Sequence, residues 1–201
     1  MKNLIPAFLF LMLLFTAACT PKSTEQSATE DTTMQEDTTA AMAEEQPQEP
    51  AEDTSQRPSP PRQATGSAGG AQITIDYGSP SVRGREIWGA LVPYGEVWRT
   101  GANEATTITL DRDVMVEGKK LPAGKYAIFT IPNKDKWTVI FNSVAEQWGA
   151  YEYNQSKDVL RVDVKPKMVD QPVEALTFDL AGDGFVIKWE KVEVPVRITT
   201  G

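Results

Sequence analysis

The sequence predicts an all-β fold over residues 71–201, an antiparallel β-sandwich of the immunoglobulin-like or jelly-roll-like kind. Apolar residues in this region alternate with polar ones, which is the period of a strand with one buried face. Turn signals rich in Gly, Pro, Asn and Asp separate these segments at short intervals. About nine short strands in two facing sheets, with one or two short helices, satisfy both observations.

The alternating segments define the expected strands in chain order. They are Gln72–Tyr77, Ala105–Leu110, Val114–Val116, Lys125–Ile131, Trp137–Asn142, Val159–Lys165, Leu176–Leu180, Phe185–Trp189 and Val192–Ile198. Pro195 lies opposite the apolar face of the last segment, which predicts a strand at a sheet edge. The expected short helices are Arg85–Val92 and part of Val144–Tyr153.

Residues 1–18 have the pattern of an export signal. Lys2 supplies a positive charge, Leu4–Phe15 is an apolar run, and Thr16, Ala17 and Ala18 are small. The apolar run is shorter than the roughly 20 residues that a transmembrane helix needs.

Cys19 follows this signal directly and is the only cysteine in the chain. A lone cysteine there resembles a bacterial lipobox, in which the thiol is acylated and becomes the mature N-terminus. The usual pattern has Leu three residues before the cysteine, where this chain has Thr16. Lipidation implies a palmitate-bearing lipoprotein, exported and anchored to the cell envelope on the periplasmic or surface face of the outer membrane. The alternative is an ordinary secretory signal cleaved after Ala18, which leaves a free thiol.

Residues 19–70 are expected to form a disordered, acidic tether rich in Thr and Pro. Residues 20–70 contain no Ile, Leu, Val, Phe, Tyr or Trp, so they lack the apolar area that would offset the entropy of ordering them. This stretch has ten acidic residues and three basic ones, whereas residues 71–201 have eighteen and sixteen. Because the predicted domain is nearly neutral, a nucleic-acid partner is not expected.

The absence of histidine narrows the chemistry. Ser-His-Asp and Cys-His catalysis both require a histidine, as do zincin motifs. One cysteine also excludes a thiolate-rich metal site. We therefore expect neither a metal nor a cofactor, and the composition favours a non-catalytic domain over an enzyme.

The most distinctive stretch is Leu91–Thr107, which combines aromatic, cationic, amide and carboxylate side chains directly ahead of a predicted strand. Glu104 has the strand parity of Ile108, so its carboxylate is expected to face the core and to need a cationic partner such as Arg99, Arg85 or Arg83. The ligand-binding candidates are Arg85, Tyr94, Trp98, Arg99, Asn103 and Glu104. These residues predict one of three things: a structural ion pair, a polar pocket with a stacking aromatic, or a catalytic carboxylate.

Three functions are consistent with these sequence features. The leading one is an envelope-anchored, non-catalytic domain that binds a glycan, a small molecule or an envelope protein, and contacts the membrane only through its lipid. The second is a hydrolase of envelope glycans that pairs Glu104 with another carboxylate. The third is a purely structural envelope lipoprotein.

Several motifs resemble one bacterial family, the domain-of-unknown-function 2911 family. They are Ser79–Arg85, Leu91–Thr106, Leu121–Tyr126, the Trp148-Gly149 pair and Leu176–Leu180. The resemblance implies an all-β fold in secreted proteins and lipoproteins, chiefly of Bacteroidota-type bacteria. The family has no established activity, so it implies no catalytic residues.

We predict that Cys19 carries lipid. Metabolic labelling with a fatty-acid probe should mark the wild-type chain and leave Cys19→Ala unmarked, because the chain has no other thiol. Equal labelling of both proteins, or of neither, contradicts the prediction.

Overall fold

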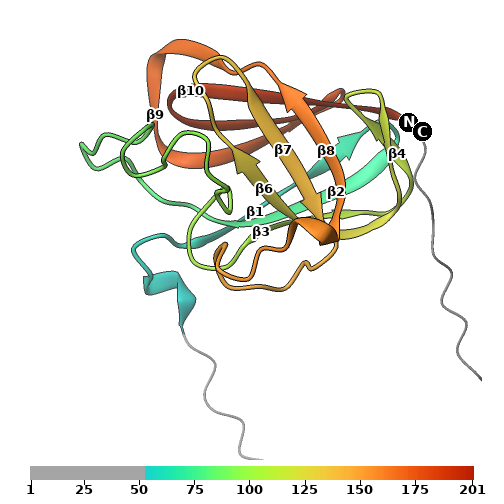
Figure 1. Cartoon of the computed structure of the whole chain (residues 1–201), viewed down its shortest axis with the longest axis horizontal. Helices are drawn as coiled ribbons and strands as arrows, with labels where there is room; N and C mark the ends of the chain where they lie inside the picture. Colours follow the sequence, from blue (N-terminus) through green and yellow to red (C-terminus); the bar gives the residue numbers. More distant parts are fainter. Residues whose placement is uncertain (1–52) are drawn as a thin grey trace, which may run out of the picture. The chain divides into compact units, whose positions relative to one another are not determined.

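Two antiparallel sheets pack against each other in the computed structural model, which describes residues 53–201 (Figure 1). The strands are β1 (Pro61–Ala68), β2 (Ala71–Gly78), β3 (Thr106–Leu110), β4 (Val114–Val116), β5 (Lys119–Leu121), β6 (Gly124–Ile131), β7 (Trp137–Asn142), β8 (Asp158–Val164), β9 (Lys167–Ala181) and β10 (Gly184–Thr200). One sheet has the order β1-β2-β3-β6-β7-β8 and the other β5-β4-β10-β9. The predicted all-β sandwich is confirmed.

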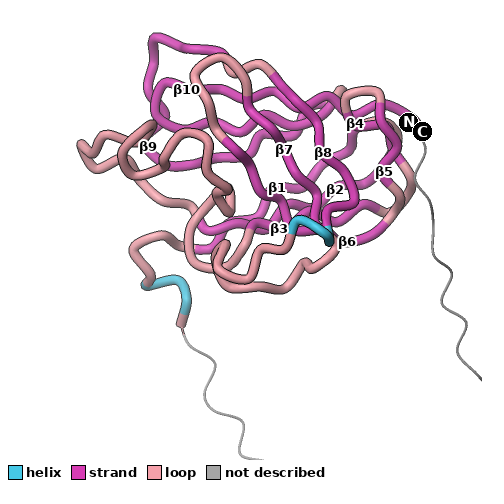
Figure 2. The backbone as a smooth tube through the Cα atoms, in the orientation of Figure 1, coloured by secondary structure: helices cyan, strands magenta, loops and turns pink. Residues whose placement is uncertain are grey.

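Helical structure in the described residues is limited to two short 3-10 turns, η1 (Thr54–Gln56) and η2 (Gln155–Lys157) (Figure 2). The helices predicted at Arg85–Val92 and within Val144–Tyr153 are wrong, because both segments are turns and loops. Gly89 interrupts the first with a φ of 89°. Within residues 53–201, no helix is long and apolar enough to cross a membrane.

Each predicted strand overlaps an observed one, and β4 and β7 have the predicted bounds. The last two predicted strands belong to one element, β10, which turns back at Glu190, where φ is 52°. The Ile198 N–H donates to the Asp183 carbonyl at 2.8 Å, so the start and end of β10 lie side by side.

The edge position predicted from Pro195 is wrong, because β10 lies between β4 and β9. Pro195 is tolerated there because it falls between two paired stretches of the strand. Pairing with β9 ends at Glu193, and pairing with β4 begins at Ile198.

The folded domain begins earlier than predicted. β1 pairs along its whole length with β2, although residues 61–70 were expected to be disordered. β1 is an edge strand whose less exposed positions, Ala64, Gly66 and Ala68, hold small residues, so it lacks the alternation of large apolar residues that identifies the other strands. Gly69 and Gly70 have φ values of 57° and 79°, which suits a two-residue hairpin turn. Cys19 and the export signal lie outside the described residues.

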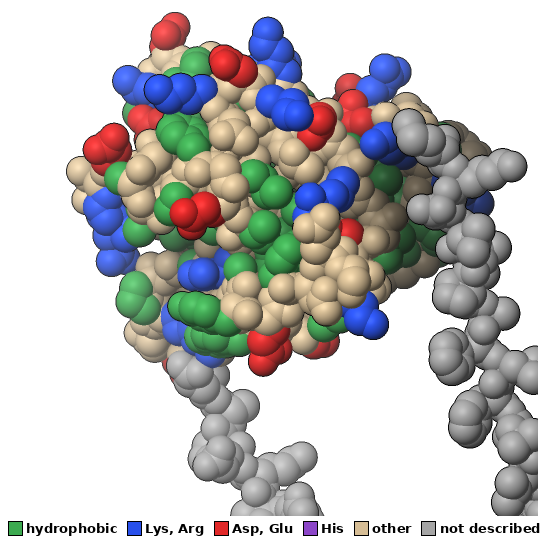
Figure 3. Space-filling model, in the orientation of Figure 1, with side chains coloured by type: hydrophobic (Ala, Val, Ile, Leu, Met, Phe, Trp, Pro, Cys, Tyr) green, Lys and Arg blue, Asp and Glu red, His purple; other side chains and the backbone are tan. Residues whose placement is uncertain are grey.

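The core lies between the sheets and contains the faces that alternation predicts. Trp137, Val139 and Phe141 of β7 are buried in it, as is Phe178 of β9. A smaller apolar cluster around Phe129 and Ile140 lies on the outer face of the six-stranded sheet. Tyr153 covers that cluster, with its ring centroid 4.9 Å from that of Phe129. Acidic and basic side chains are interspersed on the face shown in Figure 3.

We predict that Phe178→Ala lowers the free energy of unfolding by about 3–5 kcal/mol, as truncation of a buried aromatic does. Phe178 is 2% exposed and packs on Tyr77 and Phe185. Lys165→Ala removes an exposed side chain and should change stability by about 0.5 kcal/mol or less. Urea unfolding of both variants is the measurement, and similar midpoints contradict the assigned core.

Candidate functional site

Four tryptophans from distant parts of the chain contact one another. Trp137 comes from β7 and Trp189 from β10, so each sheet contributes one, whereas Trp88 and Trp98 come from the β2–β3 connection. Trp98 stacks on Trp189 with centroids 5.8 Å apart and an interplanar angle of 18°. Trp88 meets Trp98, Trp137 and Trp189 edge-on at 5.9, 5.0 and 5.7 Å. This cluster holds the long connection against both sheets.

Hydrogen bonds pin the segment that follows Trp98. The Trp98 N–H donates to the Thr130 carbonyl at 2.8 Å, and the Thr130 N–H donates back at 2.9 Å. Thr100 is fully buried with a φ of 57°, which strains a β-branched residue. The Thr106 hydroxyl donates to the Thr100 carbonyl at 3.0 Å, and the Thr100 hydroxyl donates to that of Thr130 at 3.1 Å. Backbone strain held by its surroundings is typical of functional sites.

A glycine on β2 allows this segment to approach. A Cβ added at Gly78 would lie 2.1 Å from the Ala102 carbonyl oxygen, a distance that no side chain tolerates. Gly78 therefore lets the backbone of residues 101–102 rest directly on the end of β2. The position of the loop is set by backbone contact as well as by tryptophan packing.

The loop encloses a pocket of about 290 Å³, named here the Arg99 pocket. It is lined by Ser59, Pro80, Arg85, Leu91, Val92, Trp98, Arg99, Gly101, Ala102, Asn103 and Trp189. Four of the six predicted site residues therefore come together, namely Arg85, Trp98, Arg99 and Asn103. Tyr94 and Glu104 do not line this pocket.

Arg99 is half-buried in the pocket without a compensating charge. Its Nε is buried and has no hydrogen-bond partner in the described part of the chain. The lining includes two arginines and no Asp or Glu. The indole N–H of Trp189, itself 1% exposed, is a second buried donor without an acceptor among residues 53–201. A buried donor left without a partner costs about 1–3 kcal/mol.

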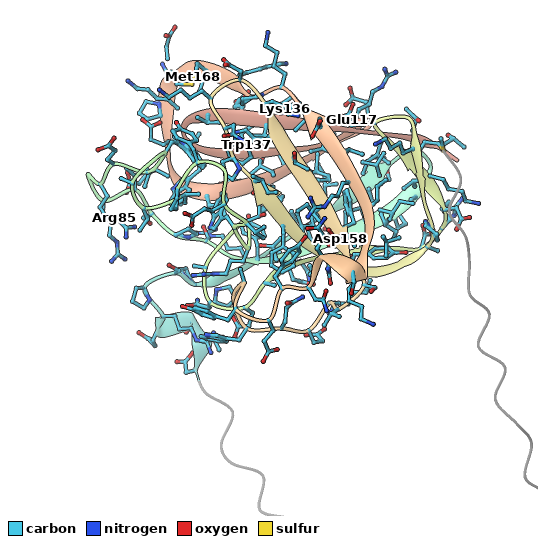
Figure 4. The ribbon with its side chains drawn as sticks, in the orientation of Figure 1. Arg85, Glu117, Lys136, Trp137, Asp158 and Met168 are labelled. Carbon is cyan, nitrogen blue, oxygen red and sulfur yellow. The ribbon has the colours of Figure 1, made fainter. Side chains whose placement is uncertain are left out.

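The other polar residues of the pocket are engaged with nearby backbone. Asn103 has a φ of 63° and donates from Nδ2 to the Ser59 carbonyl at 2.9 Å. Arg85 donates from Nη2 to the Ser81 carbonyl at 2.5 Å and from Nε to the Val82 carbonyl at 3.1 Å. Figure 4 shows Arg85 projecting from its loop, whereas Trp137 lies within the domain.

Tyr94 lies apart from the Arg99 pocket and is 37% exposed. Its ring lies against Gly89, where an added Cβ would be 3.0 Å from the ring edge. It lines two other hollows, one with Lys134 and Lys136 and one with Trp88 and Glu190.

The core-facing position predicted for Glu104 is wrong. Its side chain is 57% exposed and pairs with Arg57 at 2.8 Å, not with Arg99 or Arg85. The Arg57 guanidinium also lies 5.9 Å from the centroid of the Trp148 ring. Strand parity fails at Glu104 because β3 begins only at Thr106 and the preceding residue Asn103 is left-handed. Glu104 instead forms an isolated bridge with Trp148.

Glu104 borders a different hollow, an open groove of about 450 Å³ on the outer face of the six-stranded sheet. Asp76 and Glu146 also line it, and each accepts a hydrogen bond from a neighbouring side chain. Gln63 donates to Asp76 at 2.6 Å, and Lys125 donates to Glu146 at 2.5 Å. These carboxylates belong to polar pairs on the surface.

Ser59 and Trp189 are pocket residues that the sequence analysis missed. Ser59 lies in the predicted tether, and Trp189 belongs to a strand whose alternation marked it only as core. The Gly69-Gly70 pair was the one available signal that the domain extends towards Ser59, because two glycines between short segments predict a hairpin.

The fold and the site together define a two-sheet β-domain with a small pocket whose lining includes two tryptophans and two arginines. A family model described as a protein of unknown function (DUF2911) matches residues 59–198. The chain belongs to this family, which confirms the resemblance. The match begins two residues before β1, in agreement with the observed start of the sheet. Comparisons with curated proteins and with solved structures found no match.

We predict that Glu104→Gln changes the free energy of unfolding by about 1 kcal/mol or less, because the Glu104 side chain is 57% exposed and water screens its pair with Arg57. The Arg57 side chain that remains is 18% exposed and keeps the Trp148 ring as a neighbour at 5.9 Å. Urea unfolding of the wild type and the variant is the measurement. A loss of about 3–5 kcal/mol would instead match a buried pair and contradict this geometry.

Proposed function

We propose that this chain is an envelope-anchored bacterial lipoprotein whose β-sandwich binds a ligand, without catalysis, in the Arg99 pocket. The observation that carries the binding role is the half-buried Arg99 guanidinium, which has a buried Nε without a partner and no carboxylate among the pocket-lining residues. A bound anion that accepts from the exposed part of the guanidinium would supply the negative charge that the pocket lining lacks.

The shape of the pocket supports the same role. Small-molecule sites combine apolar walls with a few convergent polar groups. Here Trp98, Trp189 and Leu91 supply apolar surface, and Arg99 and Asn103 supply polar groups. The strained Thr100, held by two hydroxyl hydrogen bonds, fixes the loop between them. The pocket is therefore largely formed before a ligand arrives.

A glycan hydrolase is less well supported. Such an enzyme needs two carboxyl groups across a cleft, one of them in an environment that keeps it protonated. The side chains of Glu104 and Glu146 in the outer groove are 57% and 81% exposed and are paired with Arg57 and Lys125.

Among the carboxylates that form ion pairs in the described residues, that of Asp158 is the most buried. It takes part in a local hydrogen-bond network and not in a cleft with a second carboxylate. It accepts from Tyr153, Arg161 and Asn142 at 2.7, 2.7 and 2.8 Å. Burial raises the pKa of the Tyr153 phenol, and its hydrogen bond to Asp158 acts in the same direction. These partners tie the loop after β7 to β8, which is a structural role.

The anchoring half of the proposal rests on the sequence of the first nineteen residues. The apolar run, the small residues and the single cysteine that follows them are the pattern of an exported, lipidated chain. One acyl chain gives only marginal membrane binding, so stable anchoring requires the second and third chains of a bacterial lipoprotein.

We predict that a panel of small molecules and glycan fragments contains compounds that stabilise the full chain in detergent. At a hundredfold excess over Kd, binding adds about 2.7 kcal/mol, which raises Tm by about 5–10 °C for a domain of this size. Arg99→Gln should abolish the shift. Arg112→Gln is the matched control, since Arg112 is 61% exposed in a turn outside the pocket and should keep the shift.

Thermal unfolding monitored by fluorescence measures both effects, because four tryptophans surround or support the pocket. Stabilising compounds that act equally on Arg99→Gln place the binding site elsewhere. A panel with no stabilising compound contradicts the binding role.

A further inference from the structure

The chemistry of the Arg99 pocket indicates what kind of ligand it takes. We infer, resting on the proposed binding function, that the ligand is a small organic carboxylate. Its charged group binds the Arg99 guanidinium, and its compact apolar body lies against Trp98 and Trp189.

The lining of the Arg99 pocket is positively charged, which favours an anionic ligand. Arg85 and Arg99 line it, and no acidic residue does. Several surface cations of the described chain do pair with carboxylates, as in Lys120–Asp113 at 2.8 Å and Lys136–Asp163 at 2.9 Å. Arg99 has no such ion pair within residues 53–201, and its Nε is buried without a partner. An unpaired cation in a partly closed pocket attracts an anion.

The number of available donors distinguishes a carboxylate from a phosphate. Arg85 already donates from Nε and Nη2 to two backbone carbonyls, so its fork is largely occupied. The Nη groups of Arg99 remain, because they make no hydrogen bond within residues 53–201, whereas the indole N–H of Trp189 is too buried to reach a ligand. A planar fork matches a carboxylate in a bidentate geometry. A phosphate dianion would be better matched by two guanidinium groups with free donors, and two of the donors of Arg85, the second cation in the lining, are already used by backbone carbonyls.

The walls define the body of the ligand. Pro80, Leu91, Val92, Trp98 and Trp189 present apolar surface. The volume of about 290 Å³ is close to the lower limit of the roughly 300–1,000 Å³ typical of ligand pockets. The body is therefore compact and apolar, such as a single ring or a short branched chain.

Three probes of one size test the inference on the full chain in detergent. Benzoate, benzamide and benzylamine share a ring and carry a negative charge, no charge and a positive charge. We expect benzoate to bind at least about tenfold more tightly than benzamide, because hydrogen bonds to charged groups are the stronger ones. Benzylamine and inorganic phosphate should give no response over the same concentration range. Titration of the tryptophan fluorescence measures each affinity.

Variants assign the preference to Arg99. Arg99→Gln should remove the difference between benzoate and benzamide, and Arg112→Gln should retain it. Arg99→Lys keeps the charge without the planar fork, so it should retain part of the preference. If Arg99→Gln does not fold, Arg99→Lys is the variant that tests the role of Arg99.

Ionic quenchers test the charge of the pocket without any ligand. Trp148 is 55% exposed and lies beside Arg57, so these measurements use a Trp148→Phe background. Because iodide quenches indole more efficiently than caesium does, the quenching by each ion is expressed relative to its quenching of free tryptophan. On that scale iodide should quench the remaining tryptophans more than caesium does, and Arg99→Gln should reduce this difference. Equal quenching by the two ions overturns the inference.

The outcomes separate this inference from the proposed function. Equal affinity for benzoate and benzamide overturns the carboxylate assignment and leaves a neutral binding pocket. Stronger binding of phosphate than of benzoate also overturns it. If benzoate fails while a neutral compound from the wider panel binds in an Arg99-dependent manner, only the carboxylate assignment fails. If no compound binds, both proposals fail.

Discussion

The contact of four tryptophans across the two sheets is the interaction on which the rest of the domain depends. Trp137 and Trp189 belong to facing sheets, and Trp88 and Trp98 bring the long β2–β3 connection between them. A connection of this length would ordinarily be mobile, because it has little secondary structure of its own. Large aromatic surfaces offset the entropy of ordering it. The loop thereby becomes a rigid wall that shapes a pocket.

This rigidity leaves polar groups without partners. The indole N–H groups of Trp88 and Trp189 and the Nε of Arg99 are buried and lack acceptors in the described residues. Thr100 adds backbone strain at a φ of 57°. A domain selected for stability alone would replace such groups, since apolar side chains of similar shape avoid their cost. Of these residues, Arg99 and Trp189 line the Arg99 pocket, and Thr100 follows Arg99 directly in the chain. Their presence at one small pocket is the physical reason to regard it as a binding site.

The sequence predicted the sandwich well because most strands bury one face and therefore alternate. The prediction failed where burial of one strand face does not determine the sequence pattern. β1 is an edge strand held by main-chain hydrogen bonds to β2, and its inward positions are the small residues Ala64, Gly66 and Ala68, so no period of large apolar residues marks it. Glu104 was assigned by extending the period of β3 through Asn103, whose left-handed backbone breaks that period. Arg85, Trp98, Arg99 and Asn103 could be predicted because they cluster in the sequence, whereas Trp189 reaches the pocket only through the tertiary fold.

The chain enters the domain beside the pocket, which links the two halves of the proposed function. Arg57 pairs with Glu104, Asn103 donates to the Ser59 carbonyl, and Arg83 donates to the Pro58 carbonyl at 3.1 Å. The Ser79 N–H completes this attachment by donating to the Pro60 carbonyl at 2.9 Å. Residues 57–60 are thus fixed to the loop that carries Asn103 and Glu104, and Ser59 forms part of the pocket wall. The pocket therefore lies beside the segment by which the described chain enters the domain.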